Sequence, residues 1–76
     1  MQELVEYIAK SLVDRPEEVR VFLEEKEDVI VLHLSVAKED LGKIIGRQGR
    51  TARALRTLVN AASAKQERRC ILEIEE

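Results

Sequence analysis

The sequence is poor in the residues on which disulfides, metal centres and aromatic binding surfaces depend. It has no tryptophan and only one each of Cys, His, Pro, Phe and Tyr. The lone Cys70 excludes an internal disulfide and a cysteine-based metal cluster. With no activating base apparent, we interpret it as a small buried residue. Tyr7 and Phe22 are too few for a platform that stacks nucleic-acid bases.

Long apolar runs and catalytic patterns are also missing. No stretch approaches the roughly 20 residues that cross a bilayer, and Glu3 and Glu6 do not fit a signal peptide. No Ser/His/Asp, Cys/His or paired-carboxylate constellation stands out, and no Gly-x-x-x-x-Gly-Lys-Ser/Thr phosphate loop occurs. We therefore predict a protein that is not an enzyme, with no catalytic residues, metal, cofactor, small-molecule substrate or membrane partner.

The charge is small in total but unevenly distributed. The chain has 76 residues, 45% of them hydrophobic, and a formal net charge of −2, which indicates a single folded domain over residues 1–76. Residues 1–42 carry 5 basic and 11 acidic side chains, whereas residues 43–69 carry 8 basic and 1 acidic. The basic segment predicts a positive surface on an acidic protein. A solvated basic helix face is the alternative interpretation.

Hydrophobic periodicity divides the chain into six elements. Helical spacing of apolar residues predicts helices over 2–13, 38–45 and 50–66. Alternation predicts strands over 18–24, 28–36 and 70–75, the first two joined by a polar turn into an antiparallel hairpin. This order predicts a two-layer α+β domain in which three helices cover one face of a three-stranded sheet.

The same patterns predict which side chains form the core. The predicted core positions are Leu4, Val5, Ile8, Ala9, Leu12, Val19, Val21, Leu23, Ile30, Leu32, Leu34, Val36, Ala52, Leu55, Leu58, Val59, Ala62, Cys70, Leu72 and Ile74. Val31, Phe22 and His33 fall on the opposite strand faces. Phe22 is a candidate contact residue, unless its ring lies over neighbouring aliphatic side chains, and His33 is interpreted as a strand-surface residue.

The most informative stretch is Lys43-Ile44-Ile45-Gly46-Arg47-Gln48-Gly49, between two predicted helices. Without a Cβ atom at Gly46 and Gly49, another backbone can approach the turn closely. The first N–H groups of the following helix lack an intrahelical partner and carry partial positive charge. A nucleic-acid phosphate fits both features. Ile44 and Ile45 would then supply an apolar wall for bases.

Residues 40–51 and the later Arg56-Thr57-Leu58 are similar to the KhpA family, small stand-alone bacterial KH (K-homology) proteins. The element order is that of the type II KH fold, which implies a mixed three-stranded sheet. The resemblance implies binding of single-stranded RNA by the Gly-x-x-Gly loop, as a cytoplasmic RNA chaperone or post-transcriptional regulator. The candidate RNA-binding residues are Lys43, Ile44, Ile45, Gly46, Arg47, Gln48, Gly49, Arg50 and Arg53.

The long basic helix also offers a candidate protein interface. Ala54, Leu58 and Ala61 form a shoulder of mostly small side chains, which is either a contact surface or a lightly exposed alanine surface. The resemblance implies a homodimer, a heterodimer with a larger KhpB-type KH protein, or both. The alternative function is therefore a protein-interaction module in which the Gly-x-x-Gly turn is mainly structural.

Overall fold

The fold is a three-stranded sheet with helices gathered around one of its faces. A computed structural model describes residues 1–64 and 68–75. The elements are α1 (Gln2–Leu12), β1 (Arg20–Glu25), β2 (Val29–Ser35), α2 (Leu41–Ile45), α3 (Arg50–Ala62) and β3 (Arg69–Ile74), with short 3-10 turns at Pro16–Glu18, Lys38–Asp40 and Arg47–Gly49. The predicted α+β class and element order are confirmed.

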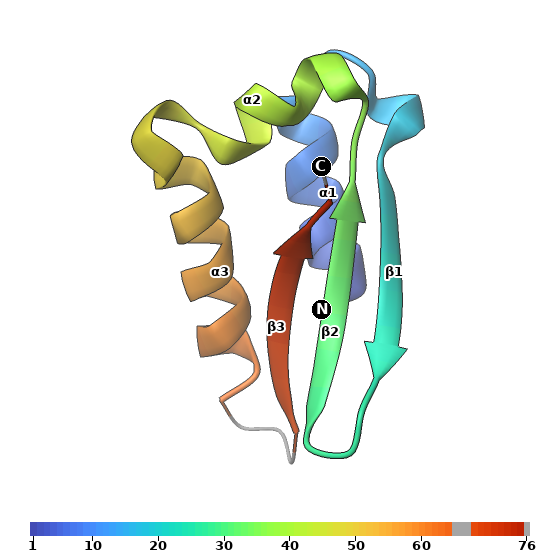
Figure 1. The fold of residues 1–76 in the computed structure, drawn as a ribbon, viewed down its shortest axis with the longest axis vertical. Coiled ribbons are helices and arrows are strands. Elements are labelled where there is room, and N and C mark those ends of the chain that lie inside the picture. Colours follow the sequence, from blue (N-terminus) through green and yellow to red (C-terminus); the bar gives the residue numbers. More distant parts are fainter. Residues whose placement is uncertain (65–67, 76) are drawn as a thin grey trace.

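The sheet is mixed, as the resemblance implied. Strand order is β1-β2-β3. β1 and β2 pair antiparallel, with Phe22 opposite His33, and β2 and β3 pair parallel, with Leu32 opposite Leu72. Figure 1 shows α1 crossing behind the sheet and α3 running beside β3, whereas β1 forms the opposite edge. α2 and the turn after it connect β2 to α3.

The core lies between the helices and one face of the sheet. Its buried members are Val5 and Ala9 on α1, Val19, Leu32 and Leu34 in and before the hairpin, Ile44 on α2, Leu55 and Val59 on α3, and Cys70 and Leu72 on β3. Burying these apolar side chains is the main stabilising contribution in such a small domain. The burial of Cys70 confirms its interpretation as a structural residue.

Several of the predicted core assignments are wrong. Periodicity identifies the apolar face of a helix or strand, but not whether another element covers that face. Leu4, Leu12, Leu23 and Leu58 are each at least 38% exposed, and Ala62 is exposed. Leu23 lies on edge strand β1, and the hairpin extends beyond α1 toward its turn (Figure 1). Conversely, Val31 is buried although it lies on the outer face, where its cross-strand partners are Glu24 and Ile71.

Element boundaries also differ from the predictions. Pro16 begins a 3-10 turn, a position that its fixed φ favours, so β1 begins at Arg20 and not at residue 18. The last helix ends at Ala62. The predicted helical positions 65 and 66 and the turn residue Glu67 lie outside the described residues.

Candidate nucleic-acid interface

The turn between α2 and α3 has a backbone that favours glycine at two positions. Gly46 has φ +78°, Gln48 has φ +57° and Gly49 has φ +74°. The Gly46 N–H donates to the Gly42 carbonyl at 2.8 Å, which ends α2, and the Gly49 N–H donates to the Gly46 carbonyl at 3.1 Å. The left-handed region strains residues other than glycine. The loop is therefore a fixed turn that leads directly into α3.

Gly46 is also packed against the helix that follows. A Cβ atom at Gly46 would lie 2.8 Å from the Thr51 backbone nitrogen and would overlap the Thr51 side chain, whereas a Cβ at Gly49 would meet nothing within 4 Å. Gly46 thus brings the end of α2 against the first turn of α3. Gly49 leaves open space at the point where a ligand backbone would approach.

The start of α3 presents backbone donors and free cations. No side chain caps its first turn, so N–H groups there carry the positive end of the helix dipole. The Arg53 Nη2 donates to the Gln48 carbonyl at 2.9 Å and holds the loop in place. Arg47, Arg50, Arg53 and Arg56 are exposed. Within residues 1–64 and 68–75, no ion pair ties any of them to an acidic side chain.

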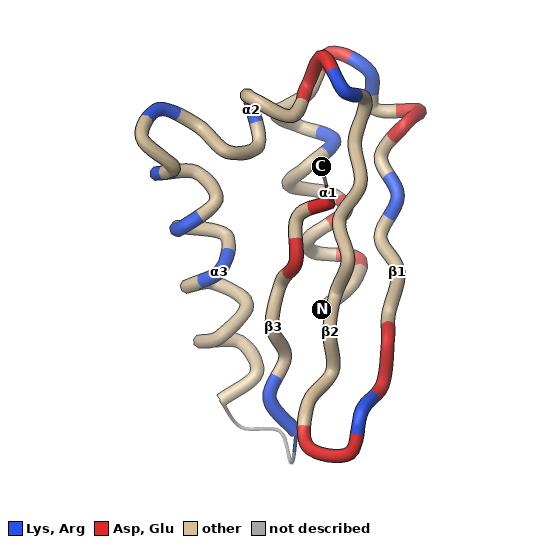
Figure 2. The backbone as a smooth tube through the Cα atoms, viewed as in Figure 1, with Lys and Arg blue, Asp and Glu red and all other residues tan. Residues whose placement is uncertain are grey.

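The charge distribution agrees with the segment counts. Figure 2 shows Lys and Arg positions along the loop and α3 with no Asp or Glu among them. Acidic positions gather at the hairpin turn, at the connection before α2 and at the end of β3. Basic positions without acidic neighbours therefore gather on the flank formed by the loop and α3, and the small net charge conceals this.

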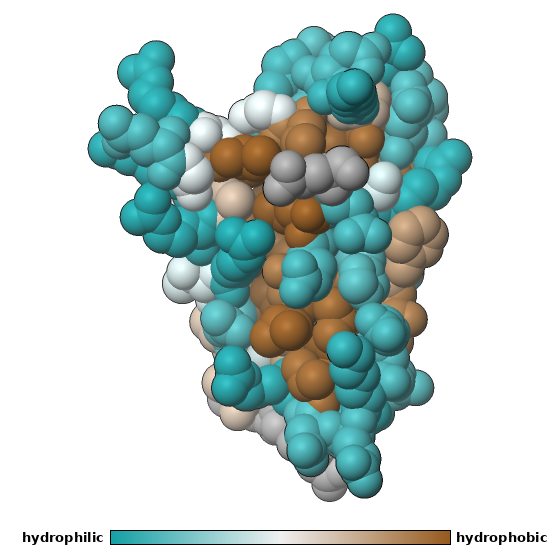
Figure 3. Space-filling model, viewed as in Figure 1, coloured by the Kyte–Doolittle hydropathy of each residue, from teal (hydrophilic) through white to brown (hydrophobic). Residues whose placement is uncertain are grey.

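A groove runs beside this basic flank. It has a volume of about 340 Å³ and is lined by Ile45, Gly49, Ala52, Arg53, Arg56 and Ile74. A second hollow of about 570 Å³ is lined by Ser35, Val36, Lys38, Leu41 and Glu75. Leu41 from one lining and Ile45 from the other lie one turn apart on α2. Figure 3 shows hydrophobic side chains running down the middle of this face, bordered by hydrophilic ones.

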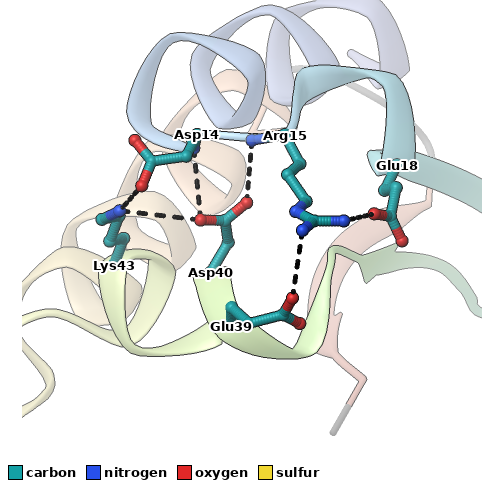
Figure 4. Close-up of polar contacts among 6 residues, drawn as sticks. All are labelled: Asp14, Arg15, Glu18, Glu39, Asp40 and Lys43. Carbon is teal, nitrogen blue, oxygen red and sulfur yellow. Dashed lines mark hydrogen bonds and ion pairs between the residues drawn. The ribbon is translucent and has the colours of Figure 1, made fainter.

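Two of the predicted contact residues have other positions. Ile44 is 0% exposed and belongs to the core, so its assignment to the apolar wall is wrong, and Ile45 and Ile74 form that wall. Lys43 forms ion pairs with Asp14 and, at 3.7 Å, with Asp40 (Figure 4). The hydrogen bond to Asp14 raises the pKa of Lys43 above its ordinary value despite partial desolvation. Lys43 therefore secures α2.

Asp40 is the centre of this connection. This residue is 1% exposed, and its carboxylate accepts hydrogen bonds from the N–H groups of Asp14 at 3.2 Å and Arg15 at 2.9 Å. Burial by itself would raise its pKa, but these bonds and the Lys43 ammonium outweigh burial, so the pKa lies below its ordinary value. Asp40 thus fixes the start of α2, and with it the loop, to the segment after α1.

Some groove residues escaped the sequence analysis. Ala52, Arg56 and Ile74 line the groove but were not proposed as site residues. Arg56 follows Arg53 by three positions, so helical spacing could have placed both on one face of α3. Its Nε donates to the Leu72 carbonyl at 3.4 Å and joins α3 to β3. Ile74 belongs to a distant strand, and no local pattern linked it to the loop.

The proposed protein interface lies on a different side of α3. Ala54, Leu58 and Ala61 are all exposed, with Leu58 at 38%. Their spacing of four and three residues places them on one stripe, and none of them lines the groove. A partner on this stripe would leave the groove open.

Two other features bear on the possible function. Among residues 1–64 and 68–75, no group of three or more His, Cys, Asp or Glu side chains is arranged to hold a metal ion. No helix within these residues is both long enough and apolar enough to span a membrane.

Comparison with known proteins agrees with this geometry. The family model described as "KhpA/KhpB, KH domain" matches residues 2–74. The chain belongs to the KhpA/KhpB KH-domain family. It is similar to proteins named RNA-binding protein KhpA, for example from Clostridium perfringens, with 54% identity over 97% of this chain and 99% of the relative. The relative from Borreliella burgdorferi is 54% identical over 95% of this chain and 88% of its own length.

A third relative of the same name, from Chlamydia pneumoniae, is 50% identical over 100% of this chain and 97% of its own. No solved structure was found to match the chain. The KH family description and the names of these relatives do not denote an enzyme, in agreement with the prediction from sequence.

Proposed function

We propose that this protein binds single-stranded RNA through the Gly46–Gly49 loop and the adjoining groove. The observation that carries the proposal is the combination of an open, left-handed glycine turn, an uncapped α3 and four exposed arginines without acidic partners among the described residues. The relatives named as RNA-binding proteins support the same function.

The geometry suggests how the backbone of the RNA is held. Phosphate oxygens would accept hydrogen bonds from N–H groups in the loop and at the start of α3, with Arg47 and Arg50 adding positive charge. Arg53 both faces the groove and supports the loop. Lys43 contributes little, because Asp14 and Asp40 already neutralise it.

The groove provides the place for sugars and bases. Ile45 and Ile74 form its apolar walls, and we propose that bases lie against them by apolar contact, since an aromatic platform is missing from this surface. KH loops hold about four nucleotides. Such a small footprint, with little base reading by side chains, suits an RNA chaperone or post-transcriptional regulator that meets many RNAs in the cytoplasm.

Replacing Arg47 and Gln48 together by Asp tests the site. The change places two carboxylates where phosphate would lie, so binding to mixed-sequence single-stranded RNA should be abolished while the domain stays folded. Lys10→Asp with Ser11→Asp is the matched control: it changes the net charge equally on exposed residues of α1. Filter binding measures affinity, and circular dichroism checks the fold. Equal affinity in the two double variants would place the site elsewhere.

Salt dependence gives a second measure of the same contact. If about three phosphates are neutralised, the logarithm of the association constant should fall with the logarithm of salt concentration at a slope near −2. The slope should become shallower in Arg47→Gln, which removes one cation. A wild-type affinity that does not change with salt would contradict phosphate binding.

A second proposal concerns Ala54, Leu58 and Ala61. Because this exposed stripe is separate from the groove, we propose that it contacts another KH domain, either a second copy or a larger KhpB-type protein. Ala61→Glu should weaken that association and leave RNA affinity unchanged, and Lys10→Glu is a control on another helix. Sedimentation over a concentration series measures self-association, and co-purification with a KhpB-type protein measures the heterodimer. Full association of Ala61→Glu in both assays would exclude the stripe.

A further inference from the structure

The free edge of the sheet has features of a second interface. β1 forms the edge opposite α3 (Figure 1). Phe22 is 52% exposed and Leu23 is 48% exposed, so each face of this strand carries a large exposed apolar side chain, and its outer edge has no partner strand within the described residues. An exposed edge with apolar side chains is a template for pairing with another strand.

The backbone of β1 shows which residues offer hydrogen bonds outward. The Lys26 N–H donates to the Val29 carbonyl at 2.8 Å, so Lys26 points its backbone toward β2. Along an antiparallel strand this direction alternates. Val21 and Leu23 therefore direct their N–H and C=O groups away from β2. The Gln2 side chain confirms this direction, because its Nε2 donates to the Val21 carbonyl at 3.0 Å.

We propose that β1 pairs antiparallel with β1 of a second copy, with Phe22 at the two-fold axis. In this register Val21 of one copy lies opposite Leu23 of the other, and the two outward-directed residues exchange both hydrogen bonds. The symmetry repeats this pair on the other side of the axis. The result is a six-stranded sheet across two molecules.

Charge selects this register among the symmetric ones that the backbone allows. With Phe22 opposite Phe22, Arg20 lies opposite Glu24 of the second copy, twice over. Shifting the register so that Leu23 faces Leu23 would place Arg20 opposite Lys26. Shifting it the other way, with Val21 facing Val21, would place Glu24 opposite Glu18. Directly opposed like charges are destabilising, so only the Phe22-centred register is complementary.

The pairing covers the exposed apolar groups on both faces of the sheet. On the outer face the two Phe22 rings meet at a non-hydrogen-bonded pair, where side chains lie closest. On the helix-facing side, Val21 packs against Leu23 of the second copy. Gln2 must release the Val21 carbonyl, and a strand hydrogen bond replaces that exposed contact. An interface made by one six-residue strand is small, which favours a weak dimer.

This dimer keeps the other surfaces available. The groove and the Ala54–Leu58–Ala61 stripe lie on the α3 side of the sheet, away from β1 (Figure 1). Each copy therefore keeps its own groove, and the two grooves lie at opposite ends of the joined sheet. The β1 pairing does not depend on RNA binding, and its test is independent of the RNA assays.

A pair of charge variants tests the register. Arg20→Glu sets two carboxylates opposite each other at both cross-strand pairs, and Glu24→Arg sets two guanidinium groups opposite each other. Each variant should therefore self-associate at least about 10-fold more weakly than wild type. Mixed in equal amounts, the two variants can form a heterodimer in which each cross-strand pair joins a carboxylate of one variant to a guanidinium group of the other, so mixing should restore association.

The double variant Arg20→Glu with Glu24→Arg restores complementarity. It exchanges the two charges within one chain, so each cross-strand pair again joins a carboxylate to a guanidinium group. These comparisons are made in the Ala61→Glu background, so that association through the stripe on α3 does not contribute. Sedimentation equilibrium up to millimolar concentration should then show a dimer for Ala61→Glu alone and with the double variant, and monomers with either single variant.

The controls separate this interface from the stripe on α3. Circular dichroism of each variant checks folding, and Ala61→Glu should retain the β1 dimer. A wild-type protein that stays monomeric at millimolar concentration would overturn the proposal. So would a double variant that associates no better than the single variants, or self-association that Ala61→Glu abolishes and the charge variants leave unchanged.

Discussion

The two flanks of the sheet use charged residues in opposite ways. On the α3 flank, Arg47 and Arg50 are exposed and have no acidic partner among the described residues. On the β1 flank, charges of both signs are engaged locally: Arg20 donates to the Glu17 carbonyl at 2.8 Å, and Glu24 lies 2.9 Å from His33. Unpartnered charge of one sign suits an anionic ligand, whereas mixed charge suits a protein edge.

Lys43 and Arg47, which are four positions apart in the chain, differ in the same way. Lys43 is held by Asp14 and Asp40, whereas Arg47 begins the unpartnered series within the described part of the chain. Sequence alone assigns both side chains to RNA binding. The structure shows that one cation helps to position the loop and that the other remains available for an external anion.

The largest effect on stability and RNA binding that we predict comes from a substitution in the turn before α3. Gly46→Ala forces a Cβ atom against the Thr51 backbone and strains a positive φ, so we expect a loss of stability of about 3 kcal/mol and no RNA binding. Gly42→Ala is the matched control. Nothing lies within 4 Å of its added Cβ, and the helix should gain up to about 1 kcal/mol.

Chemical denaturation of the two alanine variants measures this difference. Gly46→Ala should shift the midpoint to much lower denaturant, and Gly42→Ala should shift it slightly higher. A Gly46→Ala protein as stable as wild type would show that the turn adapts, and that its backbone is not the fixed element that we describe.

A smaller effect is expected at the connection that supports the loop. Asp40→Asn keeps the shape but removes the charge that Lys43 and the Asp14 and Arg15 N–H groups stabilise. We expect the melting temperature to fall by about 10 °C at neutral pH. Glu39→Asn is the control, because Glu39 is exposed and makes a single 3.6 Å ion pair with Arg15.

The contribution of Asp40 to the stability of the fold should depend on pH in a definite direction. Because the folded-state pKa of Asp40 is lowered, its stabilisation is present above the unfolded pKa of about 4 and is lost as pH falls through the folded value. The difference in melting temperature between wild type and Asp40→Asn should therefore shrink below about pH 4. A difference that stays constant down to about pH 2 would mean that the charge plays no part.

The smallest effect concerns the β1 flank. The hydrogen bond to Glu24 raises the pKa of His33, against partial desolvation and with help from Glu75 and Glu73. Its stabilisation is complete below the unfolded pKa of about 6.5 and is lost as pH rises through the folded value. His33→Gln should lower the melting temperature by about 2 °C at about pH 5.5 and less at about pH 8.5.

Glu24→Gln provides the comparison for His33, since it removes the same contact from the other side. Both variants should lose their effect in high salt, which screens exposed pairs. A His33→Gln effect that grows with pH would reverse the sign and contradict the proposed interaction. Working at micromolar protein keeps these measurements on the monomer.

Local patterns were sufficient for the fold and for the position of the turn. Alternation in Cys70 and Leu72 identified their buried face correctly, because this strand neighbours the central one and is covered by α3. Leu23 has an equally regular pattern and is exposed, because the hairpin extends beyond α1. Coverage depends on where distant helices end, and periodicity carries no information about that.

The site was predicted less completely for a similar reason. Ile44 and Ile45 are adjacent on a short helix, so only one can face the core, and sequence did not show which. Lys43 pairs with a residue 29 positions away, and Ile74 reaches the groove from the last strand. The loop itself was predictable because its glycines act through local backbone conformation.

The most direct test of the central claim is an amide NMR titration of the protein with a short mixed-sequence single-stranded RNA at low salt. We predict that shifts concentrate at residues 45–53, at Arg56 and at Ile74, while Arg20–Glu25 and the hairpin turn stay unchanged. Shifts centred on the β1 hairpin, or none at saturating RNA, would contradict the assignment of RNA binding to the glycine turn and its basic flank.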